Sequence, residues 1–188
     1  MSSILEINTK NILKNYNYLS SISKNSIAGA TIKANAYGLG DVKIFKLLYK
    51  AGCRHFFVAT FDEAEKIRKV DRRGYIYILN GLNKNIIKKI NIKDKIIPII
   101  NSIENYFEFY SYSKKNKKKI NIGIHIDTGI NRLGLTEENL SKIKSNKYLE
   151  IGVILSHLAS ADEKNNRYNE IQNNKFNKIK YLFKKTKY

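Results

Sequence analysis

Short apolar runs alternate with amphipathic stretches along the whole chain. The runs have the length of strands, and they are rich in the β-branched and aromatic residues that strands favour. They occupy residues 27–32, 55–59, 75–79, 96–100, 120–127 and 151–155. We also expect a short strand at residues 4–7. The sequence therefore predicts six main strands with a helix after each.

The stretches between the runs carry apolar residues at helical spacing. The first of these helices is capped by Asn8 or Thr9. Thr60 and Glu63 form a capping box, in which each side chain satisfies a free backbone donor of the other, and this predicts a helix from Phe61 to about Lys69. Further helices are expected from Asp41, over residues 84–90, from Ser102, over residues 136–146, and from about Asn165 to Tyr188.

This alternation predicts an α/β fold made of parallel βα units with right-handed crossovers. No Gly-x-Gly-x-x-Gly follows any strand, so a dinucleotide-binding fold has no support. The strand count fits an eight-stranded β/α barrel of the TIM type that stops after its sixth strand and helix. A doubly wound open sheet fits the pattern nearly as well.

The composition indicates an ordinary folded protein with an unusual charge. Hydrophobic residues make up 43% and charged residues 27% of the 188 residues, which excludes a disordered chain. The formal net charge of +19 raises nucleic acid as a partner. The lysines are nevertheless scattered over every helix. The densest run, residues 114–119, falls at an expected helix end, where cations are favourable, so we interpret it as a solvated helix terminus.

The cysteine count and the length of the apolar runs indicate the cellular compartment of the protein. Cys53 is the single cysteine, so no internal disulfide forms, and no Cys/His cluster has the spacing of zinc ligands. The first residues lack the pattern of a signal peptide. The apolar runs are far shorter than the roughly 20 residues that span a bilayer. We expect a cytoplasmic protein that does not bind a membrane.

Lys33 occupies a position typical of catalytic residues. It ends the apolar run 27–32, and a polar loop separates it from the helix that starts near Asp41. Active sites of parallel α/β proteins gather at the carboxyl ends of strands. An amine there is suited to bind a carbonyl compound covalently. The alternative is a lysine that only leads the strand into solvent.

The string Lys33-Ala34-Asn35-Ala36-Tyr37-Gly38-Leu39-Gly40 closely resembles the pyridoxal-phosphate motif of the alanine racemases. The resemblance implies that Lys33 carries the cofactor and that Tyr37 donates a hydrogen bond to its phosphate.

A second segment, residues 125–134, ends a strand and continues into a glycine-containing loop that presents Arg132. Arginine is always charged, and its planar guanidinium suits a phenolate or a carboxylate. The segment resembles the racemase loop whose arginine reaches the phenolic oxygen of the cofactor and the substrate. The alternative is that Asp127 and Arg132 only brace a tight loop.

One position departs from the family: His125 stands where many members have a lysine, which is carbamylated in some and holds the arginine. Either His125 orients Arg132 in another way, or the arginine is less well fixed.

The third segment, residues 155–162, contains His157 at the end of the sixth strand. A lone histidine at such a position is usually structural. The string resembles the family's Ser-His-x-Ala-Ser-Ala-Asp segment, whose histidine lies beside the pyridine ring.

The three segments follow the family's order and extend the resemblance over residues 1–188, as part of an N-terminal barrel domain without the C-terminal β domain. The resemblance implies a pyridoxal 5'-phosphate enzyme that interconverts L- and D-alanine for peptidoglycan precursors and works as a homodimer. Lys33 would act as the base on one face of the substrate carbon. A tyrosine from the partner's C-terminal domain would act on the other face. No residue of the 188 matches that tyrosine, so we expect a fragment that is inactive alone.

Two other functions remain open at this level. A related group of single-domain barrels binds the cofactor without racemising amino acids, but the intact Arg132 loop favours the racemase. Nucleic-acid binding through the positive charge predicts an affinity that falls steeply with salt.

Overall fold

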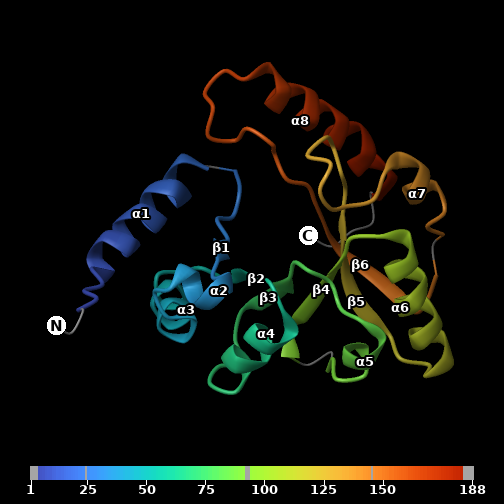
Figure 1. Ribbon diagram of the computed structural model, residues 1–188, viewed down its shortest axis with the longest axis horizontal. Helices are drawn as coiled ribbons and strands as arrows, with labels where there is room; N and C mark the ends of the chain where they lie inside the picture. Colours follow the sequence, from blue (N-terminus) through green and yellow to red (C-terminus); the bar gives the residue numbers. More distant parts are fainter. Residues whose placement is uncertain (1–3, 24, 92–93, 145, 184–188) are drawn as a thin grey trace. The chain divides into compact units, whose positions relative to one another are not determined.

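The computed structural model describes residues 4–23, 25–91, 94–144 and 146–183 (Figure 1). The chain divides into two compact units. Unit 1 comprises Met1–Leu79 and Lys93–Ile96, and unit 2 comprises Asn80–Ile92 and Ile97–Tyr188.

The described residues of unit 1 contain the first three strands and four helical segments. In chain order they are α1 (Thr9–Ile22), β1 (Ala30–Thr31), α2 (Lys33–Tyr37), α3 (Asp41–Lys50), β2 (His55–Val58), α4 (Phe61–Arg68) and β3 (Tyr75–Ile78). The strands are parallel, with β2 between β1 and β3. The Ile76 N–H of β3 donates to the Lys95 carbonyl at 2.9 Å, so the segment that leads into the fourth strand lies beside β3. The buried Phe45 and Phe56 rings pack against each other in the core, with centroids 4.4 Å apart.

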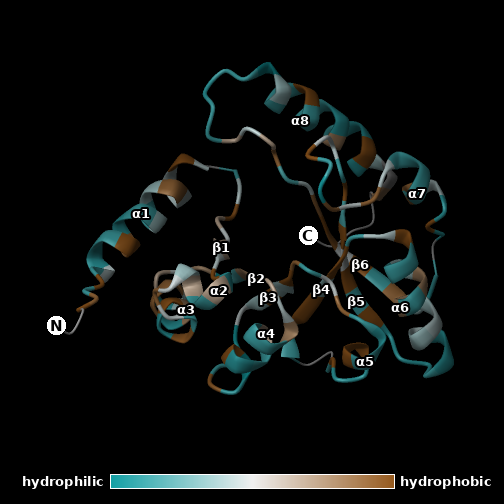
Figure 2. Ribbon diagram, viewed as in Figure 1, coloured by the Kyte–Doolittle hydropathy of each residue, from teal (hydrophilic) through white to brown (hydrophobic). Residues whose placement is uncertain are grey.

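Unit 2 contains the remaining elements. They are α5 (Lys84–Ile87), β4 (Ile96–Ile100, whose first residue belongs to unit 1), α6 (Ile103–Lys115), β5 (Ile120–His125), α7 (Glu137–Ser141), β6 (Leu149–Leu155), α8 (Arg167–Lys180) and the 3₁₀ helix η2 (Tyr181–Phe183). Strand β5 pairs in parallel with β4 and with β6, and a register shift at Ile122/Gly123 interrupts the second pairing. The strands are mainly hydrophobic, whereas α8 is mostly hydrophilic (Figure 2).

Strands that pair in chain order, with the approach to β4 beside β3, have the arrangement of a β/α barrel. A doubly wound sheet would reverse its order at a switch point. The expected α/β fold with six parallel strands is therefore confirmed. The predicted caps of α1 and α4 are confirmed too, because the Asn8 side chain accepts from the Asn11 N–H, and Thr60 and Glu63 form the capping box.

Several predicted boundaries are wrong. Residues 4–7 form no strand, and β1 is only two residues long. The helix expected over 136–146 spans only Glu137–Ser141, and the one expected over 84–90 spans only Lys84–Ile87. The last helix ends at Lys180, and residues 184–188 lie outside the described part of the chain.

Candidate functional site

Lys33 lies at the carboxyl end of β1, as the sequence predicts. The preceding residue, Ile32, is only 1% exposed, and its N–H donates to the Phe57 carbonyl of β2 at 2.8 Å. The partly buried Lys33 therefore leaves the sheet at the edge where parallel α/β proteins place their chemistry.

The segment after Lys33 is an ordered turn rather than the loop expected from the sequence. We call residues 33–38 the lysine turn. Ala34, Asn35, Ala36 and Tyr37 all have φ between 51° and 55°, in the left-handed region. Each such L-residue costs about 1–2 kcal/mol. Backbone strain of this kind is concentrated at functional sites and persists only where the surroundings fix it.

Glu63 is the side chain that fixes the lysine turn. Its Oε1 accepts from the Ala34 N–H at 2.7 Å, and its Oε2 accepts from the Ala59 N–H at 2.6 Å. The same carboxylate completes the capping box at Thr60, so one side chain ties the residue after Lys33 to the end of β2 and the start of α4. The sequence marked Glu63 only as a capping residue. Glu63 lies in the first turn of a helix that follows a strand end, and this location was the available signal for a larger role.

Tyr37 belongs to the same turn as Lys33, and the turn presents its side chain to solvent. The Tyr37 side chain is 65% exposed, whereas Ala36 beside it is 4% exposed and anchors the turn. An ideal Cβ built on Gly38 would meet nothing within 4 Å, so space is open beside the turn. The turn thus carries an exposed phenol and a partly buried lysine.

In unit 2, residues 127–134 form the loop that carries Arg132, and we call it the arginine loop. Asp127 Oδ1 accepts from the N–H groups of Gly129 at 2.9 Å and of Asn131 at 3.2 Å. The loop closes where the Leu135 N–H donates to the His125 carbonyl at 2.7 Å. Arg132 is exposed, so the loop presents its guanidinium to solvent.

His125 lies beneath the arginine loop and is 6% exposed. Its Nδ1 is 2.8 Å from Oδ1 of Asn101, while its buried Nε2 has no hydrogen-bond partner among the described residues. Burial lowers the pKa of His125 below its usual value. The positive charges of His157 and Arg132 lower this pKa further, and the negative charge of Asp127 opposes them. Arg132 and His157 therefore both lie within electrostatic reach of His125.

His157 is exposed, and its segment is held by a buried glutamine of α8. Gln172, 1% exposed, donates to the His157 carbonyl at 3.0 Å and accepts from the Ala159 N–H at 2.8 Å. It also donates to Thr128 Oγ1 at 3.0 Å, which links the segment to the arginine loop. A cavity of about 280 Å³ adjoins this network. Neither Gln172 nor Asn101 was identified from the sequence, because nothing in the local sequence of either residue indicates a partner so distant along the chain.

The four predicted site residues thus form two pairs. Lys33 and Tyr37 share the lysine turn of unit 1, and Arg132 and His157 lie near His125 in unit 2. The described residues contain no group of three or more His, Cys, Asp or Glu side chains that would hold a metal ion. In the same part of the chain, no helix has both the length and the hydrophobicity needed to cross a bilayer.

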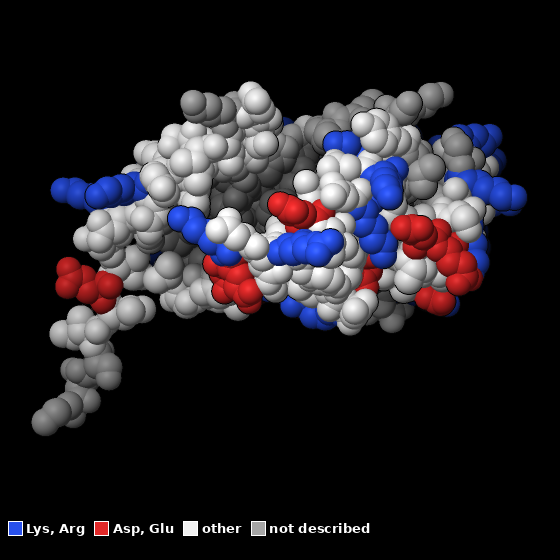
Figure 3. Space-filling model, turned by 90° about the horizontal axis from the view of Figure 1, so that it is seen from above, with Lys and Arg blue, Asp and Glu red and all other residues white. Residues whose placement is uncertain are grey.

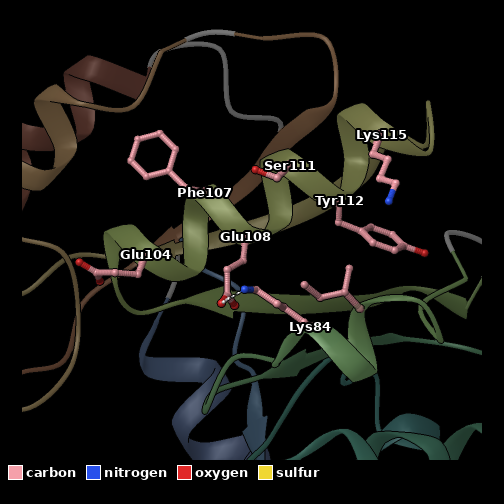
Figure 4. Close-up of a pocket in the computed structure, with 8 residues that line it drawn as sticks. Lys84, Glu104, Phe107, Glu108, Ser111, Tyr112 and Lys115 are labelled. Atoms are coloured by element: carbon pink, nitrogen blue, oxygen red, sulfur yellow. Dashed lines mark ion pairs between the residues drawn. The ribbon is translucent and has the colours of Figure 1, made fainter.

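A larger cavity, of about 420 Å³, lies away from these residues, against α5 and α6 of unit 2. An ion pair between Lys84 and Glu108, 3.5 Å long, spans its wall (Figure 4). None of the residues that line it belongs to the three motifs.

Basic side chains appear at several separate places on the face in Figure 3, with acidic side chains near some of them. Lys114 and Lys115 lie in the last turn of α6, which confirms that the run falls at a helix end.

Comparison with known proteins agrees with the three motifs. The family model described as "Alanine racemase, N-terminal domain" matches residues 7–188. The alanine racemase of Rickettsia prowazekii is 36% identical over 177 residues, which cover 92% of this chain and 44% of that protein. The alanine racemase of Rickettsia akari is 38% identical over 181 residues, covering 92% and 50%.

A solved structure shows the same relationship. The alanine racemase of Bartonella henselae, crystallised with covalently bound pyridoxal phosphate, superposes with a TM-score of 0.85 at 34% identity. The match covers 93% of this chain and 52% of that one. The chain spans about half the length of the relatives it matches. By sequence and by fold, the chain belongs to the alanine racemase family and matches the N-terminal barrel domain of its members.

Proposed function

We propose that this chain binds pyridoxal 5'-phosphate covalently through Lys33, as part of an enzyme that interconverts L- and D-alanine. The observation that carries the proposal is the lysine turn, in which a strained backbone held by Glu63 presents Lys33 at a strand end. The Bartonella relative, with its covalently bound cofactor, supports the same assignment.

The residues of the lysine turn fit the cofactor. Lys33 supplies the amine, and the exposed Tyr37 hydroxyl is a hydrogen-bond donor for a phosphate. The open space beside Gly38 leaves room for that group. In the proposal, Arg132 would donate to anionic oxygens of the cofactor and of the substrate, and His157 would help to hold the cofactor.

When bound, pyridoxal phosphate supplies an electron-withdrawing ring that makes the Cα proton of an attached amino acid acidic. The Lys33 amine would remove or return that proton on one face of Cα. Racemisation needs a second acid–base group on the opposite face, which we assign to a tyrosine of the family's C-terminal domain. We further propose a cytoplasmic homodimer that supplies D-alanine for cell-wall precursors.

The cofactor assignment is tested by borohydride reduction after incubation with pyridoxal phosphate, followed by peptide mapping by mass spectrometry. Wild type and the control Lys43→Ala, which changes an exposed lysine of α3, should each carry one adduct, on Lys33. Lys33→Ala should carry none. Adducts spread over many lysines, or unaffected by Lys33→Ala, would refute the assignment.

The racemase part is tested separately by deuterium exchange at Cα of alanine in D₂O, because this exchange needs only one base. With pyridoxal phosphate present, the chain should exchange the Cα proton of one enantiomer faster than that of the other. Lys33→Ala should abolish the difference. Equal and Lys33-independent exchange of both enantiomers would contradict a role for Lys33 as the base.

A further inference from the structure

His125 carries a buried hydrogen-bonding atom that the described residues leave unused. The side chain is 6% exposed, and its Nε2 has no partner. A buried polar atom left unsatisfied costs about 1–3 kcal/mol. Such exceptions in native proteins call for an explanation, and one is that the atom is kept for a partner that arrives in the working site.

Asn101 determines which hydrogen-bonding role this atom has. Its Nδ2 donates to the Ile99 carbonyl, so its Oδ1 is the atom that faces His125 Nδ1 at 2.8 Å. An amide oxygen only accepts, and Nδ1 therefore carries the proton. Because burial favours the neutral imidazole, Nε2 is left as a hydrogen-bond acceptor.

Arg132 is the donor best placed to use this acceptor. The arginine loop that carries it closes on the His125 carbonyl and on the Asn101 carbonyl, to which the Gly134 N–H donates at 3.2 Å. The other groups that act electrostatically on His125 are Asp127, whose carboxylate already accepts from two loop N–H groups, and the exposed His157. A guanidinium has five N–H donors and no acceptor, so it is complementary to Nε2.

We propose that His125, oriented by Asn101, is a positioning residue that holds the Arg132 guanidinium through a hydrogen bond to Nε2. One edge of the guanidinium then binds the imidazole, and the other edge is directed at the anionic oxygen of the ligand. The identity of that ligand rests on the proposed function, whereas the bond between Arg132 and His125 does not.

Two substitutions of His125 separate this role from a purely structural one. His125→Gln places an amide oxygen near the position of Nε2 and keeps the acceptor, but it loses the bond to Asn101. His125→Asn keeps a group at the position of Nδ1 that can donate to Asn101, but it loses the acceptor for Arg132. A structural role predicts that Asn is the better replacement, whereas the positioning role predicts that Gln is.

The readout is the rotation of the Arg132 guanidinium about its Nε–Cζ bond, measured by ¹⁵N NMR of the full chain with and without pyridoxal phosphate. Rotation should be hindered in wild type and in His125→Gln with the cofactor present, and fast in His125→Asn. The dissociation constant of pyridoxal phosphate should rise about tenfold in His125→Asn, equivalent to about 1.4 kcal/mol. Equal rotation in all three proteins would overturn the proposal.

A third variant protects the test against misfolding of the His125 variants. Arg132→Leu removes every hydrogen-bond donor from an exposed loop side chain, so the fold should be preserved while the bond is lost. The ¹⁵N shift of His125 Nε2 should move toward that of an unbonded acceptor in this variant, and an unchanged shift would refute the bond. Lys33→Ala, saturated with the cofactor and lacking the covalent link, should leave Arg132 restrained. The positioning role of His125 and the assignment of the cofactor to Lys33 can therefore be refuted independently of each other.

Discussion

The lysine turn and the arginine loop present their cationic side chains by different means. In the lysine turn, four successive residues adopt left-handed backbone conformations, and Glu63, from the helix after the next strand, fixes the result. In the arginine loop, Asp127 of the loop itself accepts from the N–H groups of Gly129 and Asn131, and these bonds add to the contacts with Asn101 and Gln172. The strained backbone of the first segment is fixed by a side chain from a distant helix, whereas the second segment is fixed in part by one of its own side chains.

The largest expected effect distinguishes the two glycines of these segments. Gly134 has φ of +120°, and a Cβ there would lie 2.8 Å from the Asp127 nitrogen, so Gly134→Ala should lower the free energy of unfolding by about 2–4 kcal/mol. Gly38 has φ of +91° but open space around it, so Gly38→Ala should cost only about 1 kcal/mol. Urea unfolding measures both, and equal costs would show that the arginine loop adapts as readily as the lysine turn.

The next effect tests whether a single carboxylate fixes the lysine turn. Glu63→Gln replaces one acceptor oxygen with a donor that faces a backbone N–H, so it should destabilise the protein by about 1–3 kcal/mol and weaken pyridoxal phosphate binding. The control is Glu65→Gln on the same helix, which removes only an exposed ion pair with Lys69 and should cost about 0.5 kcal/mol or less. Similar losses of stability in the two variants would contradict the claim that Glu63 fixes the lysine turn.

A pH dependence compares the partly buried His55 of unit 1 with the buried His125 of unit 2. The pKa values of His55, whose Nδ1 is 2.8 Å from the Tyr77 hydroxyl, and of His125 are both lowered, mainly by burial. Between the ordinary histidine pKa of about 6.5 and these lowered values, the unfolded chain binds more protons than the folded one. Stability should therefore be complete above about pH 6.5 and fall as the pH decreases, by at most about 1.4 kcal/mol per pH unit for each histidine.

Urea unfolding between pH 7 and pH 5 checks this decline. In His125→Gln the free energy of unfolding should decrease less steeply with falling pH than in wild type. The decrease that remains should come from His55. A stability that stays constant or rises as the pH decreases would contradict the lowered pKa values.

The smallest effect concerns the backbone strain itself. Ala34 is exposed and has φ of 51°, so Ala34→Gly relieves the left-handed penalty and loses little packing. Because glycine also gains freedom in the unfolded chain, the net stabilisation should be about 1 kcal/mol or less. The control Ala64→Gly, at a buried position within α4, should instead destabilise by about 1 kcal/mol or more. Thermal unfolding of the two variants should shift in opposite directions.

The sequence predicted the elements whose causes are local. The Asn8 cap, the capping box of Thr60 and Glu63, and the six apolar strands depend on neighbouring residues, and the structure contains them. The placement of Lys33 at a strand end followed from the same reasoning. Residues 4–7 were wrongly predicted as a strand, because an apolar run forms one only where a neighbouring strand pairs with it.

Features that depend on distant contacts were not predictable in the same way. Alanine is the residue most favourable to a right-handed helix, so nothing local at Ala34 and Ala36 indicates left-handed backbone. The pairing of Asn101 with His125 joins residues 24 positions apart, and Gln172 reaches Thr128 across 44 positions. The three motifs identified the residues that carry the chemistry, whereas the side chains that hold them became visible only in the structure.

The most direct test of the account is amide hydrogen exchange of the whole chain with and without pyridoxal phosphate, resolved over the lysine turn and the arginine loop. The account predicts that the cofactor slows exchange in both segments of the wild type, and that Lys33→Ala loses this protection at the concentration that saturates wild type. Unchanged exchange in the lysine turn, or protection that survives Lys33→Ala at that concentration, would contradict the proposed binding of the cofactor through Lys33.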